Sequence, residues 1–364
     1  MKKIWPKQNI KNILCVRLDN MGDVLMCSPA MRALRENGAK LTLLCSRAGK
    51  NISGLIPEID DAMVLQAPWV KRDGHLPSQD GAVSKMISEI QSRCFDAAVI
   101  FTTYSQSALP AALLCYLGKV PLRAAYCREN PYELINWWLP EPEPQRLIRH
   151  EVQRQLHFVN ILGYSTRDKS LSLTIPRPAR EAAYRKLTAW GISGDDWYIL
   201  HPGASASSRR YPADFFAEVI RQLYIKKNVA VLTGNKAELE IIKRICRILP
   251  GGAFRVDVTL EIEELAALIQ VSPLLISNNT GPIHIAAALQ TPVVVLYALT
   301  NPQHTPWNVL SKVLFYDVSC KFCYKSDCPE QHHLCLRRVH PDQVVESADS
   351  IMRLKKEDHV HARN

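Results

Sequence analysis

The chain has 364 residues, of which 47% are hydrophobic and 22% are charged, and this ordinary globular balance excludes an intrinsically disordered protein. Its formal net charge of +10 favours anionic partners such as nucleotides, phosphorylated sugars, nucleic acid or an anionic membrane face. Neither a signal peptide nor a transmembrane segment of roughly 20 apolar residues is visible, so we expect a cytoplasmic protein, compatible with contact to the inner membrane face.

The first half of the chain alternates between segments that favour strands and segments that favour helices. Continuous apolar runs with helical segments between them indicate βαβ units and a parallel sheet. The expected strands are residues 12–18, 40–46, 62–66, 96–101 and 123–127, and the expected helices are residues 24–37, 82–93 and 107–118. In the first helix, Pro29 either introduces a kink or, with Ser28 as the cap, begins the regular part.

The segment LPEPEPQR at residues 139–146 contains three prolines and two glutamates, which predicts an extended connection. A helix at residues 151–163 and a second alternating series are expected after it. The strands of that series are residues 197–203, 228–234, 273–277 and 292–298, and its helices are residues 213–227, 237–249, 262–270 and 282–290. We therefore expect two parallel α/β domains, residues 1–175 and 176–364.

A single carboxylate, Asp23, stands in the segment RLDNMGDVLMCSPAMRAL at residues 17–34. Because ligands of parallel sheets bind beyond the carboxyl ends of the strands, Asp23 is expected to face a cleft between the two domains. Taken alone, these residues favour a plain helix cap at Asp23, worth about 1 kcal/mol.

Three loops of the second domain follow strand ends. HPGASASSRRYPADFF, residues 201–216, carries Ser205, Arg209 and Arg210, and guanidinium groups suit bidentate phosphate recognition, although an exposed basic turn would look the same. SNNTGPIHIAAAL, residues 277–289, predicts a helix start whose backbone N–H groups at Thr280 and Gly281 bind an anion.

Two details of these loops stay open from the residues alone. His284 could equally be a packed histidine. In the third loop, LTGNKAELE at residues 232–240, Glu238 suits the dipole of its helix or the hydroxyl groups of a ribose. Neither a P-loop nor a G-x-G-x-x-G motif occurs, so a nucleotide would have to be held by separate loops.

Three segments in this order resemble glycosyltransferase family 9, the lipopolysaccharide heptosyltransferases. They are ILCVRLDNMGDVLMCSPAMRALR at residues 13–35, HPGASASSRRYPADFFAEV from residue 201, and SNNTGPIHIAAALQTPVVVLYALTNPQHTPW at residues 277–307. The resemblance extends over residues 11–350. It implies a GT-B fold, in which two Rossmann-like parallel-sheet domains face each other across a cleft.

The resemblance also implies a reaction. The family transfers a heptose with inversion from an ADP-sugar to a lipopolysaccharide inner-core acceptor and needs no cofactor for catalysis. The resemblance implies that the domain at residues 176–364 binds the donor and that the domain at residues 1–175 binds the acceptor. Asp23 corresponds to the proposed general base, and positive charge and N–H dipoles stabilise the leaving diphosphate. The implied donor-binding residues are Ser205, Arg209, Arg210, Glu238, Asn279, Thr280, Gly281 and His284.

Two positions depart from the family pattern. The family has Lys where Arg209 stands, followed by a Trp-Pro pair that is Tyr211-Pro212 here. An arginine preserves the charge for a diphosphate. The family also has Asp where Asn279 stands, and the missing carboxylate puts the identity of the sugar and of the nucleotide in question.

Four cysteines follow the pattern C-x2-C-x4-C-x6-C in the loop at residues 320–335. Four thiolates at such spacing can form a tetrahedral site for structural Zn or Fe, with the two histidines of the loop as spare ligands. Four reduced cysteines in a loop are the alternative. The members are Cys320, Cys323, Cys328 and Cys335.

The sequence also leaves other functions open. The chain could use another nucleotide sugar or another acceptor, or it could be a non-catalytic module that binds a sugar nucleotide or a metal through thiolates. The expected partners are a nucleotide-sugar donor and an anionic glycolipid acceptor at the cytoplasmic membrane face. Nucleic acid is not expected, because the basic residues do not cluster with aromatic ones.

Overall fold

A computed structural model describes the backbone of residues 5–70 and 81–361 and the side-chain surroundings up to residue 355. The chain divides into two compact units, Met1–Thr174 (unit 1) and Ile175–Asn364 (unit 2). Each unit contains a six-stranded sheet whose strand pairs run parallel. Each is described by itself.

The sheet of unit 1 has the strand order β3-β2-β1-β4-β5-β6. Its strands are β1 (Asn12–Arg17), β2 (Lys40–Cys45), β3 (Asp61–Val64), β4 (Ala97–Ile100), β5 (Leu122–Cys127) and β6 (Trp137–Pro140). The helices are η1 (Lys7–Asn9), α1 (Met21–Met26), α2 (Ser28–Arg35), α3 (Arg47–Ser53), α4 (Ala82–Ser92), α5 (Leu109–Leu117), η2 (Tyr132–Leu134) and α6 (Glu151–Ile161). The central strands β1 and β4 are almost entirely buried, as their continuous apolar runs require.

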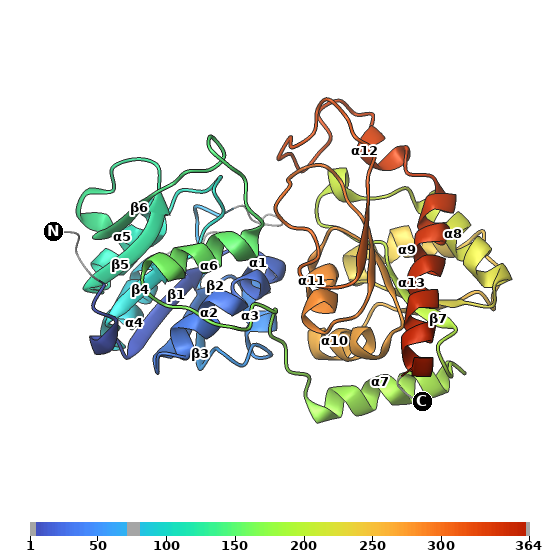
Figure 1. Ribbon diagram of the computed structural model, residues 1–364, viewed down its shortest axis with the longest axis horizontal. Coiled ribbons are helices and arrows are strands. Elements are labelled where there is room, and N and C mark those ends of the chain that lie inside the picture. Colours follow the sequence, from blue (N-terminus) through green and yellow to red (C-terminus); the bar gives the residue numbers. More distant parts are fainter. Residues whose placement is uncertain (1–4, 71–80, 362–364) are drawn as a thin grey trace. The chain divides into compact units, whose positions relative to one another are not determined.

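Helices cover the sheet of unit 1 on both faces. On one face, buried residues of α4 and α5 pack on alternate residues of β1, β4 and β5 in one hydrophobic cluster. On the other face α2 and α6 lie side by side (Figure 1). This layering leaves the ends of the strands as the places where loops can carry polar side chains.

The sheet of unit 2 has the strand order β12-β11-β10-β7-β8-β9. Its strands are β7 (Trp197–His201), β8 (Val229–Thr233), β9 (Phe254–Asp257), β10 (Leu275–Asn278), β11 (Val293–Leu296) and β12 (Ser311–Leu314). The helices are α7 (Arg177–Ala189), η3 (Ser207–Arg209), α8 (Ala213–Ile225), η4 (Lys236–Glu238), α9 (Leu239–Cys246), α10 (Ile262–Val271), α11 (Gly281–Ala288), α12 (Leu334–Arg337) and α13 (Pro341–His361). Helices α8, α9 and α13 share one apolar cluster with the strands, and α7 packs against α10 (Figure 1).

The predicted βαβ alternation is confirmed, with local differences, and helices α7, α12 and α13 lie outside the segments expected to be helical. The helix expected at residues 24–37 is two helices, α1 and α2, which meet at Cys27, and Pro29 is the second residue of α2. Helix α3 was not predicted, because its sequence RAGKNIS lacks an apolar stripe. The sheet-edge strands β6, β9 and β12 were also not predicted. Strands β9 and β12 are short, partly exposed and interrupted by charged residues, and β6 runs into the proline-rich segment that predicted an extended connection.

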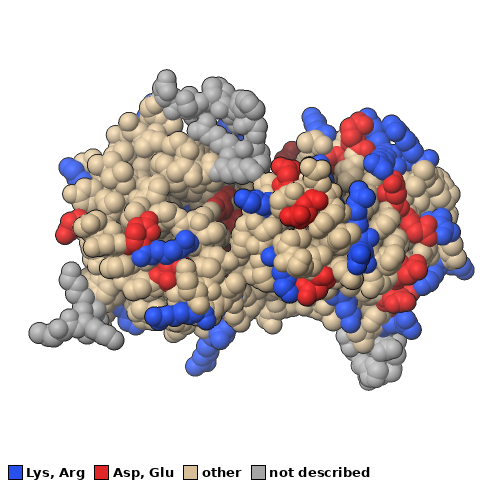
Figure 2. All heavy atoms as spheres, turned by 90° about the horizontal axis from the view of Figure 1, so that it is seen from above, with Lys and Arg blue, Asp and Glu red and all other residues tan. Residues whose placement is uncertain are grey.

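The positive charge is not gathered into one surface on the face seen in Figure 2. Lys and Arg side chains there alternate with Asp and Glu side chains. Within the described part of the chain, no helix combines the length and the apolar character needed to cross a membrane.

Candidate active site

The buried guanidinium of Arg17 organises the polar end of β1 in unit 1. Arg17 is the last residue of the strand and is fully buried. Its Nε lies 2.8 Å from Asp19 Oδ2, its Nη1 lies 2.8 Å from Glu151 Oε1, and its Nη2 lies 3.3 Å from Asp23 Oδ1. Burial alone would lower the pKa of Arg17, but Asp19 and Glu151 outweigh it and hold that pKa well above its usual value.

Asp23 combines this ion pair with a helix cap. It is the third residue of α1, and its Oδ2 accepts a hydrogen bond from the backbone N–H of Asn20 at 3.2 Å, which completes a capping box. The N-cap is Asn20, so Asp23 has a capping role at the third position of α1 and not at the N-cap position considered from the sequence. The side chain of Asp23 remains 13% exposed, so a ligand can reach the carboxylate, which the ion pair and the cap hold in one orientation.

Asp19 differs from Asp23 in its electrostatic surroundings. Burial raises the pKa of Asp19 to about 6. Arg17 and a hydrogen bond from Gln106 oppose this rise, and the neighbouring carboxylates of Asp23 and Glu151 add to it. Three carboxylates share one guanidinium here, so one of them retains a proton more readily than an isolated aspartate does.

The stability of the protein should therefore depend on Asp19 and on pH. Because the pKa of Asp19 is raised from 3.8 to about 6 in the folded state, its stabilising contribution is complete below pH 3.8 and is lost as the pH rises through about 6. We expect the free energy of unfolding of the wild type to fall over this range by roughly 2 to 3 kcal/mol relative to Asp19→Asn, measured by urea denaturation at several pH values.

Asp61 is the control, because its pKa is shifted in the opposite direction to that of Asp19. A hydrogen bond from Arg93 lowers the pKa of Asp61, so Asp61→Asn should not reproduce the effect. Equal pH dependence of the wild type and Asp19→Asn would contradict the assignment.

Glu151 fixes the other side of the Arg17 cluster. It is the first residue of α6, where the helix dipole favours a carboxylate. Gln155, one turn later, donates its Nε2 hydrogen atoms to Glu151 Oε1 at 2.7 Å and to the carbonyl of Thr102, two residues after β4, at 2.9 Å. The network thus ties the ends of β1 and β4 to α6.

In unit 2, the loops after β7 and β8 meet at Gly203 and Glu238. A Cβ atom at Gly203 would lie 1.8 Å from Glu238 Oε1, so only glycine permits this approach. Glu238 Oε2 accepts a hydrogen bond from the N–H of Asn235 at 2.9 Å. Burial lowers the pKa of His201, with Glu238 opposing the shift, and His201 Nδ1 lies 3.1 Å from Thr233 Oγ1.

The two arginines of the first donor loop have different surroundings. Arg209, at the end of η3, is half-buried, and its buried Nε has no hydrogen-bond partner among the described residues. Arg210 is exposed and donates its Nε–H to the carbonyl of Ala204 at 2.8 Å, next to the exposed Ser205. Arg209 is thus the arginine with unused donor capacity, whereas Arg210 also braces the loop.

Tyr211, which departs from the family pattern, has a packing role. The ring is buried, and its hydroxyl donates to the carbonyl of Val339 at 2.7 Å. Its backbone N–H donates to Asn278 Oδ1 at 3.0 Å, and Asn278 Nδ2 donates to the carbonyl of Pro202 at 2.8 Å. Asn278, which the sequence did not single out, therefore ties the end of β10 to the loop after β7.

The second donor loop continues from Asn278 into α11. Asn279 is buried, and its Oδ1 has no hydrogen-bond partner among the described residues. Thr280 is the N-cap of α11, and Gly281 is its first residue, so both lie where backbone N–H groups have no partner inside the helix. His284 is buried, as the packed alternative requires. The predicted loops of unit 2 thus converge at the carboxyl ends of the neighbouring strands β10, β7 and β8.

The cysteine-rich loop lies against the Arg209 loop. The backbone N–H of Ser208 donates a hydrogen bond to the carbonyl of Ser326 at 2.9 Å. The hydroxyl of Ser208 donates to the carbonyl of Lys325 at 2.8 Å. This segment therefore supports the residues directly before Arg209.

The four thiols of this loop are half-buried and close enough to influence one another. Burial raises the pKa of Cys335, and Cys328, Cys320 and Cys323 add to the rise. The Sγ of Cys320 lies 3.8 Å from His332 Nε2. As they lie, however, no three His, Cys, Asp or Glu side chains of the described residues are arranged to hold a metal ion.

The family model described as glycosyltransferase family 9 (heptosyltransferase) matches residues 83–334, more than half of the sequence. The chain belongs to glycosyltransferase family 9. It is an enzyme of the glycosyltransferase class, and the resemblance inferred from the three sequence segments is confirmed.

Relatives of this family 9 chain include two proteins named lipooligosaccharide heptosyltransferase 2. That of Campylobacter jejuni serotype O:6, strain 81116, is 28% identical over 333 residues, which are 90% of this chain and 94% of that protein. That of Campylobacter jejuni serotype O:2, strain ATCC 700819, is 28% identical over 211 residues, which are 56% of this chain and 64% of that protein.

Solved structures of glycosyltransferases share the fold, which confirms the predicted GT-B class. The family 9 glycosyltransferase of Veillonella parvula has a TM-score of 0.77 at 20% identity and covers 97% of this chain and 98% of that chain. The Escherichia coli ADP-heptose lps heptosyltransferase II has a TM-score of 0.74 at 18% identity and covers 95% and 99%. The iron-containing dodecameric glycosyltransferase TibC of enterotoxigenic E. coli has a TM-score of 0.55 at 15% identity and covers 94% and 77%.

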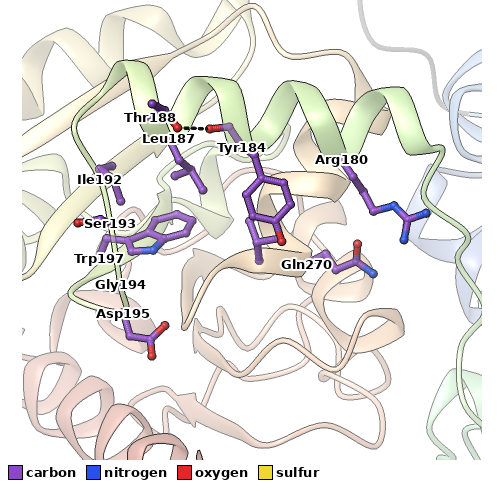
Figure 3. A pocket seen from close by; sticks show the side chains of 11 residues that line it. Arg180, Tyr184, Leu187, Thr188, Ile192, Ser193, Gly194, Asp195, Trp197 and Gln270 are labelled. Atoms are coloured by element: carbon purple, nitrogen blue, oxygen red, sulfur yellow. Dashed lines mark hydrogen bonds between the residues drawn. The ribbon is translucent and has the colours of Figure 1, made fainter.

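A separate cavity of about 620 Å³ lies on unit 2 of this family 9 chain (Figure 3). Its lining comes from α7, the loop at residues 192–195, the first residue of β7 and the last residues of α10. Because Trp197 begins β7, the cavity lies at the amino ends of the strands. It is therefore distinct from the predicted donor loops, which follow the carboxyl ends.

Proposed function

We propose that the protein transfers a heptose from ADP-heptose to a lipopolysaccharide inner-core acceptor with inversion at the anomeric carbon. Unit 1 binds the acceptor and unit 2 binds the donor. The observation that carries the proposal is the position of Asp23, a partly exposed carboxylate held by Arg17 and by its cap directly after β1 of a family 9 chain. The donor is proposed from the similar E. coli structure, which is named for ADP-heptose.

Asp23 acts as the general base in this proposal. It takes the proton of the acceptor hydroxyl while the hydroxyl oxygen forms a bond to the anomeric carbon of the sugar. The bond between that carbon and the diphosphate oxygen breaks, and ADP leaves with the electron pair. Arg17 and the N–H of Asn20 bind different oxygens of the Asp23 carboxylate, which orients it for the proton transfer.

The donor is held by the loops that converge in unit 2. Arg209 and the N–H groups of Thr280 and Gly281 supply positive charge and dipoles for the departing diphosphate. Glu238 lies at the same edge of the sheet, where its carboxylate can accept hydrogen bonds from ribose hydroxyls. Asn279 supplies a buried amide oxygen that has no partner among the described residues.

The experiment that tests the proposal is a transfer assay with ADP-heptose and a purified inner-core saccharide. Mass spectrometry should detect the saccharide extended by one heptose and an equal amount of ADP. Product formed only from another nucleotide sugar would favour the alternative donor. Binding of ADP without transfer from any donor in the panel would favour a non-catalytic sugar-nucleotide module.

Arg209→Ala should weaken binding of ADP by about 1.5 to 3 kcal/mol, the range of a charge-assisted hydrogen bond, measured by calorimetry. Adenosine should bind the variant and the wild type equally, since it has no diphosphate. Arg221→Ala, on the surface of α8 and paired with Glu218, is the control and should leave ADP binding unchanged. An equal loss for adenosine and ADP would place Arg209 away from the diphosphate.

Asn279→Asp tests which donor the pocket accepts. An asparagine keeps one acceptor oxygen, adds two N–H donors and removes the charge of the family's aspartate. With ADP-heptose as the true donor, we expect the variant to keep or raise kcat/KM. A loss of kcat/KM confined to a different nucleotide sugar would identify that sugar as the substrate of a retuned pocket.

We further propose that the acceptor is an anionic glycolipid presented at the cytoplasmic face of the membrane and that the cysteine-rich loop holds structural Zn or Fe. The TibC structure, which shares the fold, is described as iron-containing, and this description motivates the proposal of a metal here. The thiols would have to turn toward a common centre, since their present arrangement is not a ligand set. Elemental analysis of the purified protein and of a variant with all four cysteines replaced by serine tests the metal.

A further inference from the structure

The loop after β11, residues 297–304, is not one of the three donor loops, although its strand is the next one in the sheet of unit 2. The strands β8, β7, β10 and β11 are neighbours in that order. The loop follows Leu296, which ends β11 and pairs in register with Asn278, the last residue of β10. This β11 loop therefore lies at the same edge of the sheet as Arg209 and Asn279.

Tyr297 connects the β11 loop to these donor residues. Its buried hydroxyl donates to the carbonyl of Asn301 at 2.9 Å and accepts a hydrogen bond from the N–H of His304 at 3.2 Å, so the loop folds back on itself. Burial raises the pKa of Tyr297 to about 12, and the N–H of His304 opposes the rise. The charge of Arg209 and a hydrogen bond from the Asn279 side chain oppose it as well, which places the hydroxyl near both.

Two buried side chains of the β11 loop have unused hydrogen-bonding capacity. Thr300 is 3% exposed and Gln303 is 2% exposed. The Oγ1 of Thr300 and the Nε2 of Gln303 have no hydrogen-bond partner among the described residues. A buried polar atom without a partner destabilises a fold, so such an atom beside a ligand site points to a group that the ligand supplies.

The cysteine-rich loop supports both side chains. The backbone N–H of Tyr324 donates to the carbonyl of Thr300 at 2.8 Å, and the Tyr324 hydroxyl donates to Gln303 Oε1 at 3.4 Å. The amide of Gln303 is thus held by its oxygen, which leaves its Nε2 to donate elsewhere. Because the same segment binds Ser208, the loops after β7 and β11 share one support.

We propose that the β11 loop is the subsite for the transferred sugar, with Thr300 and Gln303 binding its hydroxyl groups, an inference that rests on the proposed donor site. A nucleotide sugar has the linear order ribose, diphosphate, sugar. In the proposed site Glu238, after β8, binds the ribose, and the loops after β7 and β10 bind the diphosphate. Since adjacent strands lie about 4.8 Å apart, a donor that crosses the sheet in this order brings its sugar to the loop after β11.

The chemistry of the β11 loop selects a neutral, polyhydroxylated sugar. Residues 297–304, with the sequence YALTNPQH, contain no Lys, Arg, Asp or Glu. A carboxylate or an ammonium group on the sugar would be desolvated there without a countercharge from this loop. A sugar hydroxyl both donates and accepts, so it can pair with the hydroxyl of Thr300 and accept from the Nε2 of Gln303.

The test is calorimetric binding of ADP-heptose and of ADP to the full chain without an acceptor. Thr300→Val and Gln303→Met keep the approximate size of the side chain and remove the polar atoms. Each should weaken binding of ADP-heptose by about three- to tenfold, the effect of one hydrogen bond, and leave binding of ADP unchanged. Thr300→Val should also unfold at or above the wild-type midpoint, because the hydroxyl that it removes has no partner among the described residues.

Thr291→Val is the matched control at the opposite end of β11. Thr291 lies two residues before the strand, is 2% exposed and donates its hydroxyl to the carbonyl of Ile269 at 2.8 Å. The variant should have a lower unfolding midpoint and unchanged binding of ADP-heptose and ADP. The two threonine variants are thus expected to give opposite results in both measurements, which a merely structural role of Thr300 would not produce.

Three outcomes would overturn the sugar subsite. They are unchanged binding of ADP-heptose in both variants, an equal loss for ADP and ADP-heptose, and failure of the wild type to bind ADP-heptose. Failure of the proposed reaction gives a different result, in which the variants bind ADP-heptose more weakly than the wild type but the wild type transfers no heptose to the inner-core saccharide. Transfer by the wild type with unchanged binding in the variants would refute the subsite alone.

Discussion

Asp23→Asn is expected to lower kcat by roughly 10²-fold or more while ADP binding changes little. Asparagine has the same shape and can still accept the hydrogen bond from the N–H of Asn20, so α1 keeps its cap. It cannot take a proton from the acceptor hydroxyl at neutral pH. The measurement is kcat and KM for transfer from ADP-heptose, together with calorimetric binding of ADP to both proteins.

A control separates the base from the cap. Asn20→Ala removes one half of the capping box without altering the carboxylate of Asp23, and should cost about 1 kcal/mol of stability with only a small loss of kcat. Turnover by Asp23→Asn close to that of the wild type, or an equal loss in both variants, would mean that Asp23 serves only to begin α1.

The sequence predicted those parts of the site that depend on neighbouring residues. The apolar run of β1 followed by a Gly-Asp pair predicted that Asp23 follows the end of β1, and the structure has it in the first turn of α1, the next helix. The partners of Arg17 could not be predicted in the same way, because Glu151 lies 134 residues further along the chain. A charged residue at the end of an apolar strand was the one available signal, since a buried arginine requires carboxylate partners.

In unit 2 the sequence could not distinguish neighbouring residues of the same type. Asn278 and Asn279 are adjacent and chemically identical. Only the structure reveals that Asn278 ties the end of β10 to the loop after β7, while the Oδ1 of Asn279 has no partner among the described residues. The contact of Glu238 with Gly203 also depends on how two strands are paired, which the sequence does not specify. The types of loop were predictable, but the contacts between them were not.

Arg17→Met is expected to cost about 3 to 5 kcal/mol of the free energy of unfolding at pH 8, the range for removing one partner of a buried ion pair. The variant leaves Asp19, Asp23 and Glu151 together without their shared cation. The carboxylates can relieve their repulsion by binding protons, so the loss should be smaller at pH 5 than at pH 8. Urea denaturation followed by circular dichroism at both pH values measures the difference.

Arg35→Met is the matched control, because Arg35 also belongs to unit 1 and pairs with a carboxylate, that of Asp60, but its side chain is 42% exposed. An exposed pair contributes about 1 kcal/mol or less, so Arg35→Met should be nearly as stable as the wild type at both pH values. Adding Asp19→Asn to Arg17→Met should restore part of the lost stability, since one unpaired carboxylate is removed. If Arg17→Met loses no more stability than Arg35→Met, or if Asp19→Asn restores none of it, then charge pairing at the end of β1 does not hold unit 1 together, and the orientation of Asp23 must come from its helix cap alone.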